Sequence, residues 1–202
     1  MGRGSSGIGG KSSYLSGYIQ NNPWLNNMDE KMRKSMIDNF NNMPEEQKFY
    51  YSLTADEQSV LEGMQYNTKT LNEYMSGRRT DLTDEQKADL EKEISSVKSA
   101  IKKYTVQKPG TLYRGVSKAE FDSIASGKAT DSFKSTSTDI SRAKSFANNQ
   151  GGYIVEYRYG KGARIADVGG VPGANEREYL IDSGVKYKKV KKVSDRHIVV
   201  EI

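Results

Sequence analysis

Residues 101–116 read IKKYTVQKPGTLYRGV, and the pattern of the chain changes within this stretch. Before it, apolar residues recur at the three- and four-residue spacing of helices. After Pro109-Gly110, short runs rich in aromatic and β-branched residues follow, and this dipeptide ends the helical half. Helices first and strands second are typical of an α+β fold rather than of an alternating α/β fold.

The residues before this boundary predict several helices. A large apolar residue recurs every fourth position from Met28, which predicts a helix that Pro44 ends. Two capping-box sequences, which begin at Thr54 and Thr83, predict two further helix starts. The predicted helices cover residues 28–42, 54–64, 68–75 and about 83–104.

The residues after the boundary predict strands with two short helices between them. Tyr153–Tyr159 places aromatic and apolar residues at alternate positions, which is typical of a half-buried strand. We expect the short helices at 117–125 and 139–148. Further strands are expected at 111–114, 164–168, 179–181, 185–193 and 198–202.

Length and composition exclude several classes of protein. The chain has 202 residues, which suits one domain, and a net charge of +5. It has no cysteine, which excludes disulfides and thiol nucleophiles, and its one histidine argues against a Ser–His triad or a histidine-rich metal site. It has neither an apolar run long enough to span a membrane nor an N-terminal apolar segment of the secretory type, so we expect no membrane span and no signal peptide.

The chain divides into a leader and a main domain. Residues 1–13 hold five glycines and four serines, a composition that buries little surface. We therefore expect residues 1–46 to be a flexible or helical leader. Residues 47–202 form the main domain, with a helical part over 47–108 and a β-rich part over 109–202.

Three short motifs in the β-rich part carry chemistry. Arg114 is the last residue of a short predicted strand and precedes Gly115. This arrangement suits a phosphate clamp, because the guanidinium group is a fixed fork of donors and glycine lets a ligand approach the backbone. Ser135 opens a Ser-Thr-Ser run, whose hydroxyls could orient another group. Glu176 and Glu178 lie two residues apart, so an extended chain points both carboxylates to one side. Paired carboxylates can act together at an anomeric carbon.

The order Arg, Ser-Thr-Ser, Glu-x-Glu resembles the Arg–Ser–Glu class of mono-ADP-ribosyltransferases. This class includes the actin-modifying binary toxins, the clostridial Rho-modifying exoenzymes and several phage-encoded transferases. The resemblance spans residues 47–202 and extends to Phe146, Tyr66 and the segment 71–75. It implies a helical layer followed by two small packed antiparallel β-sheets, which form a cleft for NAD.

The resemblance also implies roles for the motif residues. Arg114 would hold the diphosphate of NAD. Ser135 would hydrogen-bond to the catalytic Glu178, which would bind the 2′-hydroxyl of the nicotinamide ribose and stabilise the oxocarbenium ion. Glu176 would orient the acceptor and take its proton. In this family a Glu at that position accompanies arginine as the acceptor.

Further residues are assigned by the same resemblance, which requires no metal. Some toxins carry an Arg at the positions of Asn149 and Ser76, so the second phosphate contact stays unassigned. A Gly-rich loop over 169–175 would help to recognise the protein target through Gly170, Val171 and Pro172, together with Glu176, which follows the loop. The residues expected to bind NAD are Arg114, Gly115, Ser135, Thr136, Phe146 and Asn72.

The sequence therefore predicts an NAD-dependent protein-arginine ADP-ribosyltransferase, a glycosyltransferase that releases nicotinamide. One alternative is an NAD glycohydrolase that depletes NAD, and another is a non-enzymatic interaction or virion protein on a degenerate transferase fold. We expect the partners to be NAD and an arginine-bearing protein of a host or competitor cell. We expect a monomer with no membrane span and no nucleic-acid partner, which acts in the cytoplasm of the target cell as an injected effector or a phage-encoded protein.

A basic stretch near the C-terminus has two interpretations. It is either a solvated strand face whose lysines protect a sheet edge, or an electrostatic dock for an acidic target or nucleic acid. The sequence favours the first interpretation and leaves the second open. The stretch consists of Lys186, Lys188, Lys189, Lys191 and Lys192.

Overall fold

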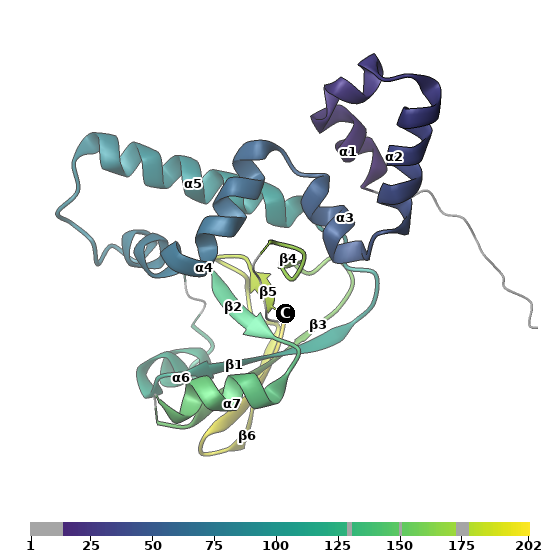
Figure 1. Ribbon diagram of the computed structural model, residues 1–202. Helices are drawn as coiled ribbons and strands as arrows, with labels where there is room; N and C mark the ends of the chain where they lie inside the picture. Colours follow the sequence, from purple (N-terminus) through teal and green to yellow (C-terminus); the bar gives the residue numbers. More distant parts are fainter. Residues whose placement is uncertain (1–13, 129–130, 150, 173–177) are drawn as a thin grey trace, which may run out of the picture.

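The computed structural model describes residues 14–128, 131–149, 151–172 and 178–202, and it has an α+β fold (Figure 1). Its helices are α1 (Leu15–Asn21), the 3-10 helix η1 (Pro23–Asn27), α2 (Glu30–Asn42), α3 (Glu45–Tyr51), α4 (Ala55–Met75), α5 (Asp84–Lys103), α6 (Lys118–Ala125) and α7 (Ile140–Asn148). Its strands are β1 (Gly110–Val116), β2 (Lys134–Ser137), β3 (Tyr153–Tyr159), β4 (Ile165–Asp167), β5 (Glu178–Ile181), β6 (Lys189–Ser194) and β7 (His197–Glu201). The α+β fold class is therefore confirmed.

The helix starts follow the local signals of the sequence. Both capping boxes form, so α4 begins after Thr54 and α5 begins after Thr83. Helix α4 continues without a break through the residues where the sequence predicted two helices, because Leu61 and Leu71 both pack into the main core. In the part of the chain that the structure describes, no helix is long and apolar enough to cross a membrane.

The strands form a sheet in the order β4-β5-β2-β1-β3-β7-β6. Strands β1 and β2 share one register pair, Tyr113 with Ser137, so the sheet divides there into two halves. Ile165 and Ile181 of the first half share a buried cluster with Tyr157 of the second, which packs the halves on each other. The structure thus differs from the expected pair of antiparallel sheets in two respects: hydrogen bonds join the halves, and β3 and β7 are parallel.

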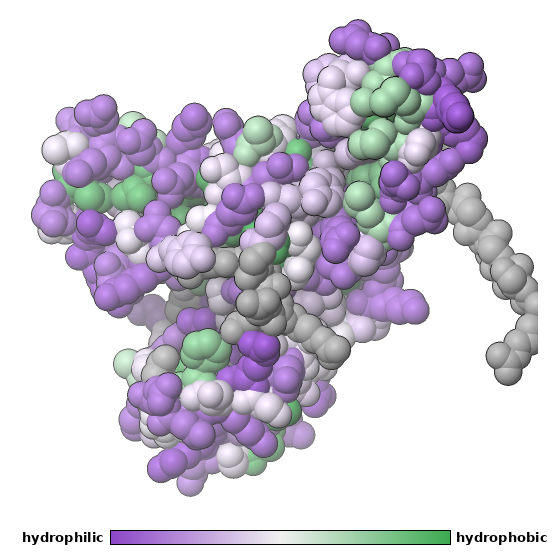
Figure 2. Space-filling model, in the orientation of Figure 1, coloured by the Kyte–Doolittle hydropathy of each residue, from purple (hydrophilic) through white to green (hydrophobic). Residues whose placement is uncertain are grey.

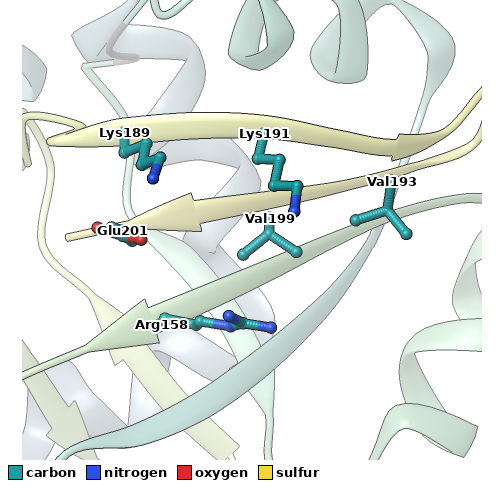
Figure 3. Close-up of a pocket in the computed structure, with 6 residues that line it drawn as sticks. All are labelled: Arg158, Lys189, Lys191, Val193, Val199 and Glu201. Carbon is teal, nitrogen blue, oxygen red and sulfur yellow. The ribbon is translucent and has the colours of Figure 1, made fainter.

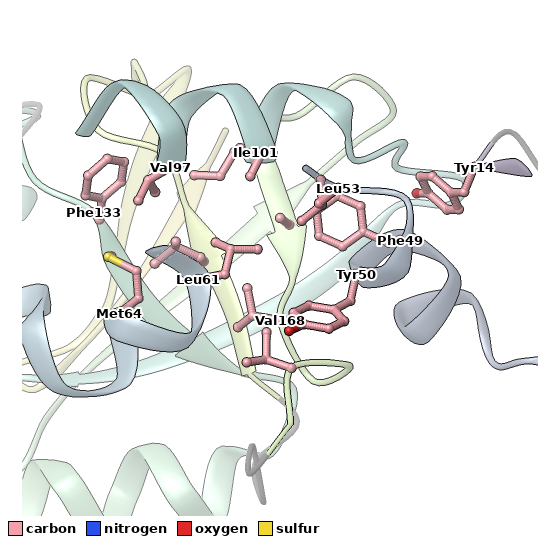
Figure 4. Close-up of a cluster of buried hydrophobic side chains, with 14 of the residues drawn as sticks. Tyr14, Phe49, Tyr50, Leu53, Leu61, Met64, Val97, Ile101, Phe133 and Val168 are labelled. Atoms are coloured by element: carbon pink, nitrogen blue, oxygen red, sulfur yellow. The ribbon is translucent and has the colours of Figure 1, made fainter. Parts of the chain in front are cut away.

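A large apolar cluster joins the helical layer to the first half of the sheet (Figure 4). Leu61 of α4 and Ile101 of α5 pack there with Phe133, just before β2, and with Leu180 of β5. The N-terminal helices join the same cluster through buried side chains such as Phe40. Burial of each such side chain stabilises the fold by about 1.5–3 kcal/mol, so the helical layer holds β2 and β5 in place.

A buried carboxylate also fastens α4 to α5. Glu57 is 4% exposed and accepts hydrogen bonds from the backbone N–H of Thr54, the hydroxyl of Ser99 and the ammonium group of Lys103. Burial alone would raise the pKa of Glu57, but these hydrogen bonds outweigh it and lower the pKa. The start of α4 is thereby tied to the end of α5.

Helix α7 lies directly against β1 at Gly115. A Cβ atom at this position would clash with the carbonyl oxygen of Ala143 and lie 2.5 Å from the backbone nitrogen of Ala147. Both are backbone atoms of α7, so they cannot move aside as a flexible side chain could. Only glycine therefore allows α7 to pack this closely on β1.

We predict opposite effects of the same substitution at two glycines. Gly115→Ala should destabilise the protein by about 1–3 kcal/mol, because the added methyl group overpacks the contact between α7 and β1. Gly63→Ala, in α4, meets no atom within 4 Å and should stabilise by about 1 kcal/mol, because alanine favours helices. Urea unfolding of both variants measures the difference, and an unchanged stability of Gly115→Ala would contradict the packing argument.

Candidate active site

Three neighbouring strands carry the predicted catalytic residues. Arg114 is in β1, Ser135 is in β2 and Glu178 is the first residue of β5 (Figure 1). Strand β2 lies between β1 and β5 and is paired with both. The structure therefore brings together three motifs that lie up to 64 positions apart in the sequence.

The register shows which hydroxyl faces Glu178. Ser137 is directly opposite Glu178 across the β2–β5 ladder, whereas Ser135 is opposite Leu180. Side chains two residues apart on a strand share a face, so Ser135, Ser137 and Glu178 lie on one face of the sheet. Ser137 was not among the site residues predicted from the sequence, although its position two residues after Ser135 was a signal that it shares this face.

Two hydrogen bonds hold the guanidinium group of Arg114. Its Nε donates to Oε1 of Glu120 in α6 at 3.1 Å, and one terminal nitrogen donates to the carbonyl oxygen of Ser135 at 2.8 Å. The first bond is also an ion pair, in which each side chain is 26% exposed. A guanidinium group has five N–H donors, so these two contacts fix its plane and leave donors for an anion.

A buried lysine lies next to these residues in the chain. Lys134 is 1% exposed and donates a hydrogen bond to the carbonyl oxygen of Ser132 at 3.1 Å. Burial, together with the positive charge of Arg114, lowers the pKa of Lys134 from 10.5 to about 8. A charged residue directly before the Ser-Thr-Ser run was a signal in the sequence, but its burial was not predictable because burial depends on elements that are distant in the chain.

Asn72 of α4 is hydrogen-bonded to the backbone of Phe133, the residue just before β2. Its side-chain nitrogen donates to the carbonyl oxygen of Phe133 at 3.0 Å, and its side-chain oxygen accepts from the backbone N–H of Phe133 at 2.8 Å. Both ends of the amide are therefore bound by the residue just before β2. The structure gives Asn72 a positioning role, and its direct contact with NAD stays a prediction.

The remaining residues that were expected to bind NAD have different surroundings. The space beside Gly115 is filled by α7, so this glycine serves helix packing rather than an open approach for a ligand. Thr136 is 4% exposed, and its hydroxyl donates to the carbonyl oxygen of Tyr179. Phe146 is 55% exposed on α7 and is available to a ligand. Contacts of the three with NAD stay predictions.

The base of the predicted recognition loop is packed on the helical layer. A Cβ atom at Gly170 would clash with the carbonyl oxygen of Glu46, and the side chain of Val171 is part of the main core. Pro172 is exposed and can face a partner. Glu176 lies outside the described residues, so its role stays a prediction.

Two surface pockets lie away from Arg114, Ser135 and Glu178. One, of about 180 Å³, is formed by β3, β6 and β7 and is shown in Figure 3. Lys189 and Lys191 line it from β6, which is the last strand of the sheet and is largely exposed. The other, of about 340 Å³, includes Lys186 and Lys188 among its lining residues. An edge strand rich in lysine supports the first interpretation of this basic stretch, which is protection of a sheet edge.

The face of the molecule that is shown in Figure 2 is largely hydrophilic. The chemistry available at the three central strands is a fixed cation, a carboxylate and several hydroxyls. In the described part of the chain, no group of three or more His, Asp or Glu side chains could hold a metal ion. These groups suit a reaction in which a phosphate-bearing molecule is held while positive charge develops beside a carboxylate.

Comparison with known proteins gives consistent matches. The chain is 33% identical over 99 residues to the NAD(+)–arginine ADP-ribosyltransferase EFV of Enterococcus faecalis. This alignment covers 46% of this chain and 20% of that protein. It is similar in structure to Plx2a, an ADP-ribosyltransferase toxin from Paenibacillus larvae, with a TM-score of 0.58 and 19% identity over 77% of this chain and 89% of that one. It is also similar to C2-I, the enzymatic component of the C2 toxin from Clostridium botulinum, with a TM-score of 0.56 and 22% identity over 78% of this chain and 44% of that one.

These structural likenesses confirm the fold of the chain. The sequence match to EFV additionally concerns the activity that is named for that protein. The chain spans only about a fifth of the length of EFV, so that protein's acceptor is not thereby assigned to this one. Residues 37–200 match the family model of the ADP-ribosyltransferase exoenzymes, which is most of the chain. The protein therefore belongs to the ADP-ribosyltransferase exoenzyme family, whose members use NAD as substrate.

Proposed function

We propose that this protein transfers ADP-ribose from NAD to an arginine side chain of a target protein and releases nicotinamide. The observation that carries this proposal is the placement of Arg114, Ser135 and Glu178 on three adjacent strands. Two further observations favour arginine as the acceptor. The sequence has Glu176 two residues before Glu178, and the related EFV is named as an arginine ADP-ribosyltransferase.

The reaction assigns one task to each of these side chains. Arg114 binds the diphosphate with the donors that Glu120 and Ser135 leave unused. The bond between the ribose C1′ and the nicotinamide nitrogen breaks, and the bonding electron pair leaves with neutral nicotinamide. The carboxylate of Glu178 stabilises the oxocarbenium ion that remains. A guanidinium nitrogen of the acceptor then attacks C1′, and its proton passes to Glu176.

Ser135 and Ser137 hold Glu178 on the correct face of the sheet. The two hydroxyls and the carboxylate share this face, and Ser137 is the residue directly across the ladder. A carboxylate that is held by neighbouring groups loses little freedom when the substrate binds. The proposal therefore extends the positioning role of the first serine to the third residue of the Ser-Thr-Ser run.

Two alternatives differ from this proposal in their products. In an NAD glycohydrolase, water replaces the acceptor, but Glu176 has no evident task there because hydrolysis needs no acceptor-orienting carboxylate. A non-enzymatic protein on the same fold would not need the three motifs in register. We further propose that the protein acts as a monomeric toxin on a protein inside a host or competitor cell, in the manner of an injected effector or a phage-encoded transferase.

We predict that Glu178→Gln lowers the rate of nicotinamide release by roughly 100-fold or more, because a neutral amide cannot stabilise the oxocarbenium ion. The test is incubation of bacterial and eukaryotic lysates with biotin-NAD, together with measurement of free nicotinamide. Glu201→Gln makes the same change at an exposed position in β7 and should retain activity. Labelled bands that persist in Glu178→Gln would contradict the role of Glu178, whereas rapid NAD loss without bands in the unaltered protein would favour the glycohydrolase.

We predict that Glu176→Gln separates the two activities. Transfer to protein should be lost, because the acceptor is no longer oriented and has no base to take its proton. Slow NAD hydrolysis should persist, because Glu178 is intact. Hydroxylamine sensitivity of the bands made by the unaltered protein reports the arginine linkage, and equal loss of both activities in Glu176→Gln would contradict this division of roles.

A further inference from the structure

Four basic residues line one surface pocket that has no task in the reaction described above. This basic pocket has a volume of about 340 Å³ and is lined by Lys161 and Arg164, which lie between β3 and β4, and by Lys186 and Lys188, which lie between β5 and β6. All four are exposed. None of the described residues that line the pocket is acidic. The fold thus gathers positive charge from two separate loops at one place.

The two loops are fastened to each other and to the sheet. The side chains of Arg164 and the buried Asp182 form an ion pair, and the backbone N–H of Asp182 donates to the carbonyl oxygen of Arg164 at 3.0 Å. The backbone N–H of Lys188 donates to the carbonyl oxygen of Glu201 in β7 at 2.8 Å. These contacts fix the backbone from which the basic side chains extend.

The positive charges of the basic pocket exceed the negative charges around it. Arg164 is compensated by Asp182. Asp131 is the other acidic residue close by, because a Cβ atom at Gly184, which lines the pocket, would lie 3.8 Å from its carboxylate. In the part of the chain that the structure describes, no carboxylate forms an ion pair with any of the three lysines. A hollow lined by one sign of charge concentrates the electric field and attracts groups of opposite charge.

Protection of a sheet edge does not explain these three lysines. The edge strand β6 begins at Lys189, so Lys186 and Lys188 precede it, and Lys161 lies in a different loop. The lysines within β6 are sufficient to protect that edge. The three lysines of the basic pocket repel one another without serving the sheet, which points to an anionic partner.

The composition of the basic pocket favours an acidic protein over a nucleic acid as this partner. None of the described residues that line it is aromatic, and the ring of the neighbouring Tyr187 packs on the interior Tyr157, with 6.4 Å between the ring centroids. Stacking on bases is therefore not supplied. Proteins that bind nucleic acid by charge typically contact about 6–10 phosphates, which is more than three lysines can neutralise.

We propose that the basic pocket docks an acidic segment on the surface of the target protein and so selects which proteins are modified. This inference rests on the proposed function, because it takes a protein as the acceptor. Glu178 begins β5 and the loop that carries Lys186 follows the end of β5, which is about 10 Å further along the strand. A standard interface covers about 800 Å² on each partner and is thus roughly 30 Å across, so one target protein can reach both places.

The first test compares a protein acceptor with a small one. The variant Lys161→Glu/Lys186→Glu/Lys188→Glu should label lysate proteins with biotin-NAD at a rate roughly tenfold lower or less, because like charges then face the target. Transfer to agmatine, a guanidine compound too small to reach the pocket, should be unchanged. Unchanged labelling of lysate proteins would overturn the inference. An equal loss with agmatine would also overturn it, because the pocket would then serve the catalytic groups.

A matched control has the same change in net charge. The variant Lys31→Glu/Arg33→Glu/Lys102→Glu reverses exposed residues of α2 and α5 and should label lysate proteins like the unaltered protein. Salt gives an independent reading, because it screens exposed charges. Labelling by the unaltered protein should fall several-fold between about 50 mM and 300 mM salt, and labelling by the pocket variant should change little. An equal loss of labelling in the control variant would refute a role specific to the pocket.

The second test measures binding directly and does not require transferase activity. A fluorescent poly-glutamate peptide should bind the unaltered protein and lose at least tenfold in affinity with the pocket variant. Equal affinity for the two proteins would overturn the inference. Tighter binding of an RNA oligonucleotide than of the peptide, lost in the pocket variant, would also overturn it and assign the pocket to nucleic acid. Absence of both nicotinamide release and labelling by the unaltered protein would instead refute the proposed function.

Discussion

The pair of hydrogen bonds between Asn72 and the backbone of Phe133 fixes the helical layer to the strand on which the site depends. Strand β2 begins at the next residue and lies between β1 and β5. Its pairing with β1 is short, so β2 is not held by the sheet alone. The contact from α4, together with the apolar cluster around Phe133, supplies the rest of its support. A shift of β2 would separate the residues that flank it.

The site sits at the junction between the two halves of the sheet. Strand β1 pairs with β2 there, β5 pairs with the other side of β2, and α6 and α7 pack against the β1 half. Close packing is common to the residues at this junction: Gly115 has no side chain because α7 must approach β1, and Lys134 is buried in β2 directly before Ser135.

Much of the fold was predictable from the sequence, because many of its signals are local. The capping boxes at Thr54 and Thr83 start helices by hydrogen bonds within four residues. The alternation in Tyr153–Tyr159 predicts β3 correctly because it reflects a two-sided strand. Helix α3 was not predicted, because its seven residues form less than two turns and are too few to show a helical spacing of apolar residues. The central position of β2 was not predicted, because order within a sheet depends on partners that are distant in the chain.

For the site, the sequence by itself determined the kinds of chemical group and their order along the chain: an arginine, a hydroxyl run and a pair of glutamates. It also determined the class of fold, because helix and strand patterns are written in neighbouring residues. The tertiary structure decided that Ser137 faces Glu178, that Asn72 holds the start of β2, and that Lys134 is buried. These three facts join residues from different strands and helices, and only the packing of the complete chain sets such register and burial.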